Sequence, residues 1–261
     1  MLLEVVDLSK TFGGIAAVSH ASFGVAERSI TALIGPNGAG KTTMFNLLTG
    51  LIRADSGMIR FAGRSIERLR TDLVARAGLV RVFQSPRILT RMTVRENMML
   101  AAKDQPGERF GMAWMAPARV ARREAEIRAQ AENLLGLLRL SHLAEAFAGT
   151  LSGGQRKLLE LGRTLMVEPR MILLDEPMAG VAPVLAEQLL EHVKMLRAQR
   201  GITVCIIEHD LDLIMSVSDH VVVMDEGTVI ASGSPAEVQA DGRVIEAYIG
   251  RLDAAVVADA S

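Results

Sequence analysis

Short apolar runs alternate with stretches of helical periodicity along most of the chain. The runs predict strands at residues 2–8, 22–25, 30–34, 57–61, 79–83, 171–174, 203–207, 221–224 and 228–231. Helices are expected over residues 44–48, where apolar side chains recur after the third run, and from Pro183 to just before Gly201. Because strands alternate with helices, the pattern predicts an α/β fold with a mostly parallel sheet in a three-layer core.

The middle of the chain has a helical pattern instead. Thr93 begins one predicted helix there, and Glu96, three residues later, completes a capping-box arrangement. A long charged helix is expected over residues 118–138, and a further helix from near Ser152. The sequence therefore predicts a helical region inserted into the α/β core. The segments expected to be loops are 9–14 and 103–111.

The composition excludes some classes of function. The 261 residues include 29 basic and 30 acidic ones, so the net charge of −1 gives no general preference for polyanions. Aromatic residues make up only 3%, which leaves few platforms for stacking on single-stranded nucleic acid. The single cysteine, Cys205, lies inside a predicted strand, and we expect it to be a core thiol in a reducing compartment.

No targeting or membrane-spanning segment is predicted. Glu4 and Asp7 interrupt the N-terminal region where a signal peptide would be continuously apolar. No apolar run approaches the roughly 20 residues that cross a bilayer. These features predict a cytoplasmic protein without a membrane span.

A Gly-rich segment follows the predicted strand 30–34 and precedes the helical pattern. It consists of Gly35, Pro36, Asn37, Gly38, Ala39, Gly40, Lys41, Thr42 and Thr43. In this context it is a phosphate-binding loop pattern, whose backbone N–H groups and helix N-terminus attract phosphate. Lys41 is expected to reach the β- and γ-phosphates, Thr42 to ligate Mg²⁺, and Thr43 to lie near the α-phosphate. The flanking strand and helix disfavour the alternative, a Gly-rich turn with a surface lysine.

Two carboxylates end the predicted strand 171–174. Asp175 and Glu176 are expected at the carboxyl edge of the sheet, the same edge as the phosphate loop. Asp175 is suited to hold Mg²⁺, often through water, and Glu176 to polarise an attacking water. The alternative is a pair of solvated acids at a strand end, which the phosphate loop disfavours.

The segment Leu-Ser-Gly-Gly-Gln at 151–155 is followed by a helical pattern and then by Asp175-Glu176-Pro177. This order resembles the signature arrangement of ABC-type ATPases, and the resemblance covers about residues 2–250. It implies one ATP-binding domain with an antiparallel β portion. Its expected parts are a single domain at 1–250, a nucleotide-binding core at 1–84 and 166–250, a helical subdomain at 85–165, and a disordered tail at 251–261.

The resemblance also implies roles for further residues. The signature would bind the γ-phosphate of an ATP held by the opposite subunit, through Ser152, Gly153, Gly154 and Gln155. Two ATP molecules would then lie between two nucleotide-binding domains. Gln84 matches the glutamine that touches Mg²⁺ or the water, His209 the switch histidine at the γ-phosphate, and Phe12 the aromatic that stacks on adenine. Phe12 could instead be an ordinary loop hydrophobe.

One position departs from the family pattern. Ala182 stands before Pro183, where the family usually has Asp or Asn. In the family that side chain helps to couple the two ATP sites. Its loss puts symmetric hydrolysis in doubt and favours an unlike partner ATPase.

Four looser stretches resemble the ATP-binding subunits of branched-chain amino-acid-type importers, a group that includes urea and amide uptake systems. They lie at residues 12–18, 83–87, 207–210 and 244–250. The resemblance implies two transmembrane permease subunits, a second ABC ATPase subunit, identical or different, and indirectly a solute-binding protein. It places the chain peripherally on the cytoplasmic face of the inner membrane.

Methionines gather in the helical region after Gln84 and suit an adaptable contact with a permease helix: Met92, Met98, Met99, Met112 and Met115. Core packing is the alternative, above all for Met98 and Met99. Three other functions stay open: an ATPase of a lipid or lipopolysaccharide exporter, a soluble ABC protein acting in DNA repair or on ribosomes, and a small-molecule kinase. The signature disfavours the kinase, and the near-neutral charge disfavours nucleic-acid binding.

Overall fold

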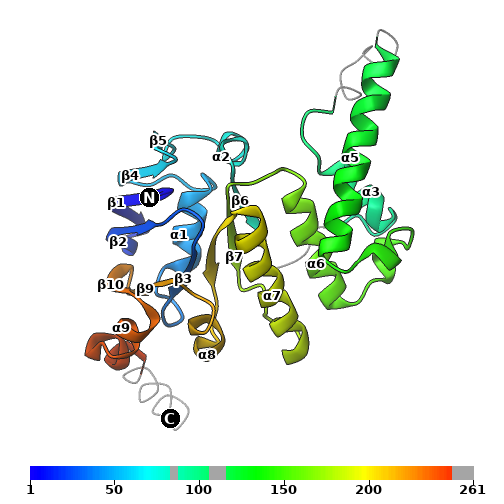
Figure 1. The fold of residues 1–261 in the computed structure, drawn as a ribbon. Helices are drawn as coiled ribbons and strands as arrows, with labels where there is room; N and C mark the ends of the chain where they lie inside the picture. Colours follow the sequence, from blue (N-terminus) through cyan, green and yellow to red (C-terminus); the bar gives the residue numbers. More distant parts are fainter. Residues whose placement is uncertain (83–87, 106–115, 249–261) are drawn as a thin grey trace. The chain divides into compact units, whose positions relative to one another are not determined.

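The computed structural model describes residues 1–82, 88–105 and 116–248 (Figure 1). Its contacts divide the chain into two compact units. The described residues of the first unit fall within 1–81, 170–177 and 193–248, and those of the second within 82–169 and 178–192. The contacts thus group residues 178–192 with the helical unit, whereas the subdomain boundaries expected at residues 84 and 165 stay a prediction.

A six-stranded, mostly parallel sheet forms the centre of the first unit, in the order β10-β9-β3-β8-β7-β6. The strands are β3 (Ile30–Ile34), β6 (Leu79–Val82), β7 (Met171–Asp175), β8 (Thr203–Ile207), β9 (His220–Asp225) and β10 (Thr228–Gly233). β3 pairs in parallel with both β8 and β9, and β8 pairs in parallel with β7. The predicted sheet is confirmed, and its parallel strands place their carboxyl ends at one edge.

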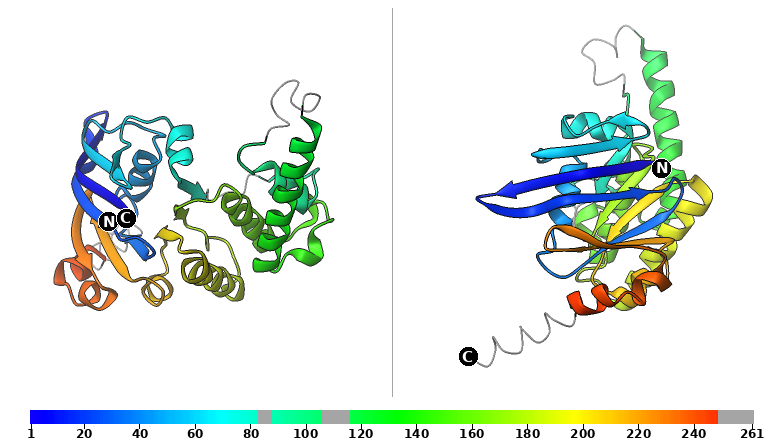
Figure 2. Two further views of the ribbon diagram at one scale, coloured as in Figure 1. Left: turned by 45° about the horizontal axis from the view of Figure 1, so that its top comes forward. Right: turned by 90° about the vertical axis from the view of Figure 1, so that its left-hand side faces the viewer.

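A second, antiparallel sheet contains β1 (Leu3–Phe12), β2 (Ile15–Val25), β4 (Ser56–Phe61) and β5 (Arg64–Ser65), in the order β2-β1-β4-β5. Figure 2 shows β1, β2 and β4 side by side. The prediction of a loop over residues 9–14 was wrong, because β1 continues to Phe12. Gly13 and Gly14 have φ of 53° and 89°, which permits a two-residue turn and lets the hairpin close directly.

Helix α1 (Lys41–Leu48) contributes to the hydrophobic core together with both sheets. Met44, Phe45, Leu47 and Leu48 of α1 belong to one buried cluster with residues of β1, β2 and β4 and with alternate residues of the parallel strands. Met171 and Leu173 of β7 illustrate this two-residue period. The core thus fixes α1 at the carboxyl end of β3. Cys205 of β8 is fully buried in the same cluster, as a core thiol.

The second unit contains the predicted helices α3 (Val94–Leu100), α5 (Pro117–Leu137) and α6 (Gly153–Leu165), with short 3-10 turns at Ser141–Leu143 and Ala148–Thr150. The Thr93–Glu96 capping box is present at α3. Met98 is fully buried, so it packs in the core, and Met112 and Met115 lie outside the described residues.

Helix α7 (Pro183–Arg200) begins at the predicted proline. Three short helices were not predicted: α2 (Thr71–Ala77), α8 (Leu211–Met215) and α9 (Pro235–Gln239). Each has one buried side chain in the helix, so an apolar period could not reveal it. Among the described helices, none is both long enough and apolar enough to span a membrane.

Candidate functional site

The phosphate loop connects β3 to α1, and two of its glycines are required by close backbone contacts. A Cβ on Gly35 would lie 2.0 Å from the Met224 carbonyl oxygen of β9. A Cβ on Gly40 would lie 2.3 Å from the Ala17 carbonyl oxygen of β2. Their φ angles of 146° and 95° also lie in the region that favours glycine. The loop is therefore held between the two sheets by contacts that only glycine permits.

Lys41, the first residue of α1, turns its ammonium back onto the loop. Its Nζ donates to the carbonyl oxygens of Gly35 at 2.6 Å and of Pro36 at 2.9 Å. Because Lys41 is 6% exposed, the charge lies inside the loop and not in bulk water. The helix that follows has no acidic residue in its first turn, so its positive end is not neutralised there. The loop and helix together form an environment suited to phosphate.

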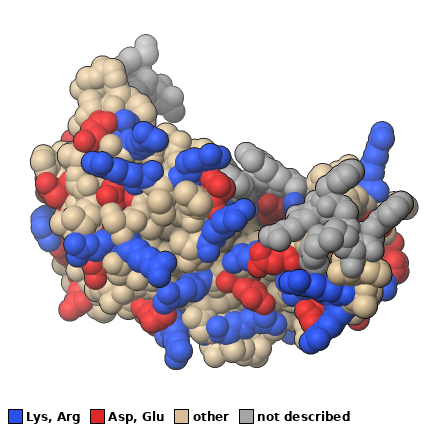
Figure 3. All heavy atoms as spheres, turned by 90° about the horizontal axis from the view of Figure 1, so that it is seen from above, with Lys and Arg blue, Asp and Glu red and all other residues tan. Residues whose placement is uncertain are grey.

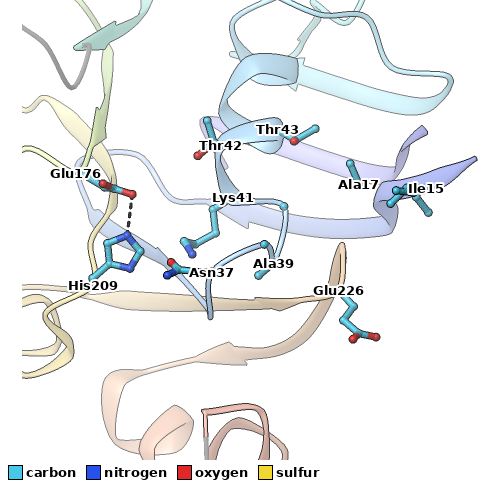
Figure 4. A pocket seen from close by; sticks show the side chains of 13 residues that line it. Ile15, Ala17, Asn37, Ala39, Lys41, Thr42, Thr43, Glu176, His209 and Glu226 are labelled. Atoms are coloured by element: carbon cyan, nitrogen blue, oxygen red, sulfur yellow. Dashed lines mark hydrogen bonds and ion pairs between the residues drawn. The ribbon is translucent and has the colours of Figure 1, made fainter. Parts of the chain in front are cut away.

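A pocket of about 530 Å³ lies along this loop, within the range of roughly 300–1,000 Å³ that ligand sites occupy. Its lining comprises Ile15, Ala16, Ala17, Asn37, Gly38, Ala39, Gly40, Lys41, Thr42, Thr43, Glu176, His209 and Glu226. Figure 4 shows Glu176 and His209 together on one side of Lys41, and Ile15 and Ala17 on the other. The structure thus brings seven predicted loop residues, from Asn37 to Thr43, together with the predicted catalytic pair.

Glu176 and His209 face each other across the ends of β7 and β8. His209 Nε2 lies 2.7 Å from Glu176 Oε1, and the Glu176 backbone N–H donates to the Ile207 carbonyl at 3.0 Å. Glu176 has a φ of 47°, a left-handed conformation that is uncommon for a residue with a side chain. The geometry suits a carboxylate that a histidine orients.

Asp175 lies one residue earlier, at the end of β7, and is 7% exposed. Its Oδ2 accepts a hydrogen bond from Nη2 of Arg81 on β6. The Asp175 carboxylate and the Thr42 hydroxyl supply oxygen donors, which fit Mg²⁺ because this ion is usually held by one or two protein groups, water and substrate phosphates. Within residues 1–82, 88–105 and 116–248, no group of three or more His, Cys, Asp or Glu side chains could hold a metal by itself.

The other predicted residues that the structure describes are not in this lining. Phe12 is 48% exposed, with its ring centroid 5.3 Å from Lys10 Nζ. Gln84 lies outside the described residues. The signature belongs to the second unit, where Ser152 caps α6, and the Gln155 side chain accepts from the Ser152 backbone N–H at 2.9 Å. These residues are not part of the pocket lining.

Ala182 immediately precedes α7, and its carbonyl oxygen accepts from the backbone N–H groups of Leu185 at 2.9 Å and Ala186 at 3.1 Å. It therefore occupies the helix N-cap position, where Asp, Asn or Ser usually supplies a side-chain acceptor. Nearby, Lys157 Nζ of α6 donates to the Ala179 carbonyl at 2.7 Å. Within the second unit, this hydrogen bond thus attaches the segment before α7 to α6, the helix that begins at the signature.

Sequence reasoning missed four residues of the pocket: Ile15, Ala16, Ala17 and Glu226. The first three lie at the start of β2, which was expected to begin only at residue 22. Glu226 lies in the turn between β9 and β10, where Gly227 donates to the Ala39 carbonyl at 3.1 Å. Residues 15–17 lie within the 12–18 stretch that resembles the importer group, but that resemblance assigns no site role to them or to Glu226. Contacts between segments distant in sequence bring both to the loop, since the Ala17 carbonyl lies against Gly40 and Gly227 bonds to Ala39.

Comparison with known proteins agrees with this geometry. Residues 18–179 match the family model described as ABC transporter, and residues 228–254 match one described as branched-chain amino acid ATP-binding cassette transporter. A high-affinity branched-chain amino acid transport ATP-binding protein of Pseudomonas aeruginosa, BraF, is 39% identical and covers 95% of this chain and 98% of its own. A probable branched-chain amino acid transport ATP-binding protein of Archaeoglobus fulgidus, LivG, is 40% identical over 98% of both chains.

Solved structures give the same result. A nucleotide-free ATP-binding cassette from an ABC transporter is 40% identical, with a TM-score of 0.80. The ADP conformation of another ABC transporter cassette is 38% identical, with a TM-score of 0.81. Each covers 95% of this chain and 98% of its own. With a family model that matches more than half of the sequence and relatives that match nearly all of it, this chain belongs to the ABC transporter family.

Proposed function

We propose that this chain is the ATP-hydrolysing subunit of an ABC importer for branched-chain or other amino acids. The observation that carries the proposal is the pocket in which the phosphate loop meets the Glu176–His209 pair. The match of residues 228–254 and the relatives' role in branched-chain amino acid transport favour amino-acid transport over lipid export.

Lys41 and the backbone N–H groups of the loop bind the phosphates of ATP in this proposal. A nucleotide phosphate would take the Lys41 ammonium from the Gly35 and Pro36 carbonyls, since a charged acceptor forms a stronger hydrogen bond than a neutral one. Thr42 and Asp175 would hold Mg²⁺, which neutralises charge on the phosphates. Gln84 is proposed as a further contact, and Phe12 as the platform for adenine.

Glu176 polarises the attacking water, and His209 orients the Glu176 carboxylate and contacts the γ-phosphate. The 2.7 Å contact between them supports this division of roles. Residues 152–155 would complete the site of a second ATPase subunit with their N–H groups at the N-terminus of α6. Two ATP molecules would then be held between two subunits.

The proposed output is mechanical. ATP favours the closed pair of subunits, hydrolysis releases it, and two membrane permeases follow this population shift. A solute-binding protein would deliver the amino acid, and the chain would lie on the cytoplasmic face of the inner membrane. Figure 3 shows Lys and Arg side chains interspersed with Asp and Glu on one face, which offers no uniform basic surface to nucleic acid there.

Purification of the tagged protein from its native membranes in mild detergent tests the proposal. Mass spectrometry is expected to identify two multi-span permeases, an ATPase subunit and a solute-binding protein, and the last can then be screened with amino acids. Recovery with ribosomes or DNA would refute the transport function. Permeases that carry lipid would refute the amino-acid assignment but retain the ATPase.

A further inference from the structure

Arg81 is a buried charged residue that the mechanism above does not use. It lies on β6, and its guanidinium contacts two different elements of the first unit. Nη2 donates to Asp175 Oδ2 at the end of β7, and Nη1 donates to Asn46 Oδ1 of α1 at 2.6 Å. The Arg81 and Asp175 side chains are 9% and 8% exposed. This pair is therefore shielded from water.

The contacts of Arg81 connect both parts of the proposed Mg²⁺ site. α1 carries Thr42 in its first turn, and β7 ends at Asp175. The Arg81 guanidinium also lies 5.9 Å from the ring centroid of Phe45, next to Asn46 on α1. A planar guanidinium with several donors in fixed directions can bridge two such groups, whereas an ammonium acts as a single point charge. Arg81 thus fixes the position of the carboxylate relative to the helix.

The charge of Arg81 has a second consequence. A buried carboxylate needs a compensating positive charge, and removal of that charge is strongly destabilising. Arg81 supplies the charge before any metal binds. A divalent cation that approaches Asp175 then meets a carboxylate already neutralised on one oxygen, and it is repelled by the guanidinium.

We propose that Arg81 is a positioning residue that ties Asp175 to Asn46 and serves as the counter-charge of the carboxylate, so that it lowers the affinity of the site for Mg²⁺. The predicted effect of Arg81 on Mg²⁺ affinity rests on the proposed function, because it requires Asp175 to face the ion. The linkage to Asn46 and Asp175 does not require a nucleotide.

Metal binding gives the first test. The affinity for Mn²⁺ in the presence of ADP is measured from the electron paramagnetic resonance of free Mn²⁺, and the affinity for ADP alone in EDTA. Arg81→Met is expected to tighten Mn²⁺ binding at least about tenfold, because a repulsive charge within a few ångströms is removed. ADP affinity in EDTA should stay at the wild-type value. Arg81→Lys, which keeps the charge, should bind Mn²⁺ as the wild type does.

Arg170→Met is the matched control, because Arg170 pairs with Glu27 at 3.0 Å but both side chains are at least half exposed. It should change neither affinity. Unchanged or weaker Mn²⁺ binding by Arg81→Met, with normal ADP binding in EDTA, would overturn the counter-charge role.

Stability gives a second test that needs neither metal nor nucleotide. Urea unfolding is compared for the wild type, Arg81→Met, Asp175→Asn and the double variant. Arg81→Met should lower the urea midpoint, and the same change in the Asp175→Asn background should lower it less, because the buried carboxylate charge that Arg81 compensates is then absent. If Arg81→Met does not fold, the double variant is still expected to fold. Additive losses, or a double variant that does not fold, would overturn the inference. A wild type that binds no ADP would instead refute the ATPase proposal.

Discussion

At the residue scale, Glu176 follows β7 directly and contacts His209, an arrangement that suits a catalytic carboxylate. We predict that Glu176→Gln binds ATP as the wild type does but hydrolyses it at least about a hundredfold more slowly, because the amide cannot accept a proton from water. Phosphate release and the binding of a fluorescent ATP analogue measure the two properties separately.

Glu124→Gln on α5 serves as the control, since Glu124 is exposed and distant in sequence from the pocket residues. It should leave both properties unchanged. Equal hydrolysis by Glu176→Gln and the wild type would exclude the role assigned to the carboxylate.

Cys205 shows how burial alone changes the chemistry of one residue. Burial raises the pKa of its thiol from 9.0 to about 12, because the thiolate is not solvated in the core, and a backbone hydrogen bond from Ile206 opposes this only in part. We predict that the folded protein resists iodoacetamide between pH 7 and 10. After denaturation in urea, modification should accelerate as the pH rises through about 9. Mass spectrometry of the single cysteine follows both reactions, and rapid modification of the folded protein at pH 8 would contradict the buried thiol.

At the element scale, α7 begins without a side-chain cap because Ala182 occupies the N-cap position. We predict that Ala182→Asp raises the free energy of unfolding by about 1 kcal/mol, since the carboxylate can accept from a backbone N–H of the first turn and favours the helix N-terminus. Urea unfolding measures the change. Ala182→Gly is the comparison that supplies no acceptor.

The same substitution restores the residue type that the ABC ATPase resemblance leads us to expect before Pro183. A gain in stability without a change in hydrolysis would mean that the alanine affects the helix alone. A loss of stability would show that the N-cap side chain cannot reach the first turn.

Local sequence signals predicted the elements with strong apolar periods or clear caps. The strands β3, β7 and β8, the phosphate loop, the Thr93 capping box and the start of α7 at Pro183 were all predictable, because each depends on residues close in sequence. The extension of β1 to Phe12 was missed, because residues 9–14 contain no apolar run and only backbone pairing with β2 defines the strand there. Glu226 and residues 15–17 joined the pocket through contacts between segments distant in sequence. Arg81 was missed because a lone arginine on a strand carries no motif, and its partners lie 35 and 94 residues away.

At the scale of the whole molecule, the pocket residues belong to the first compact unit of the chain and the signature to the second. In the proposed function, the signature completes the site of a second subunit. Gly153 offers a way to disable the signature without disturbing the fold, because a Cβ at this position would meet nothing within 4 Å. An aspartate there would also favour the N-terminus of α6, while its charge repels phosphate.

We predict that Gly153→Asp and Lys41→Ala each lose ATP hydrolysis alone and recover part of it when mixed. In the mixed pair, the intact phosphate loop of the first variant meets the intact signature of the second, so one complete site forms. Gly153→Ala is the matched control and should keep most of the activity, because it fills the same open space without a charge. Phosphate release at increasing protein concentration measures the recovery. A Gly153→Asp variant that hydrolyses ATP like the wild type, at a rate per chain independent of concentration, would show that one chain suffices. Recovery only after addition of a different ATPase subunit would instead identify the working pair as a heterodimer.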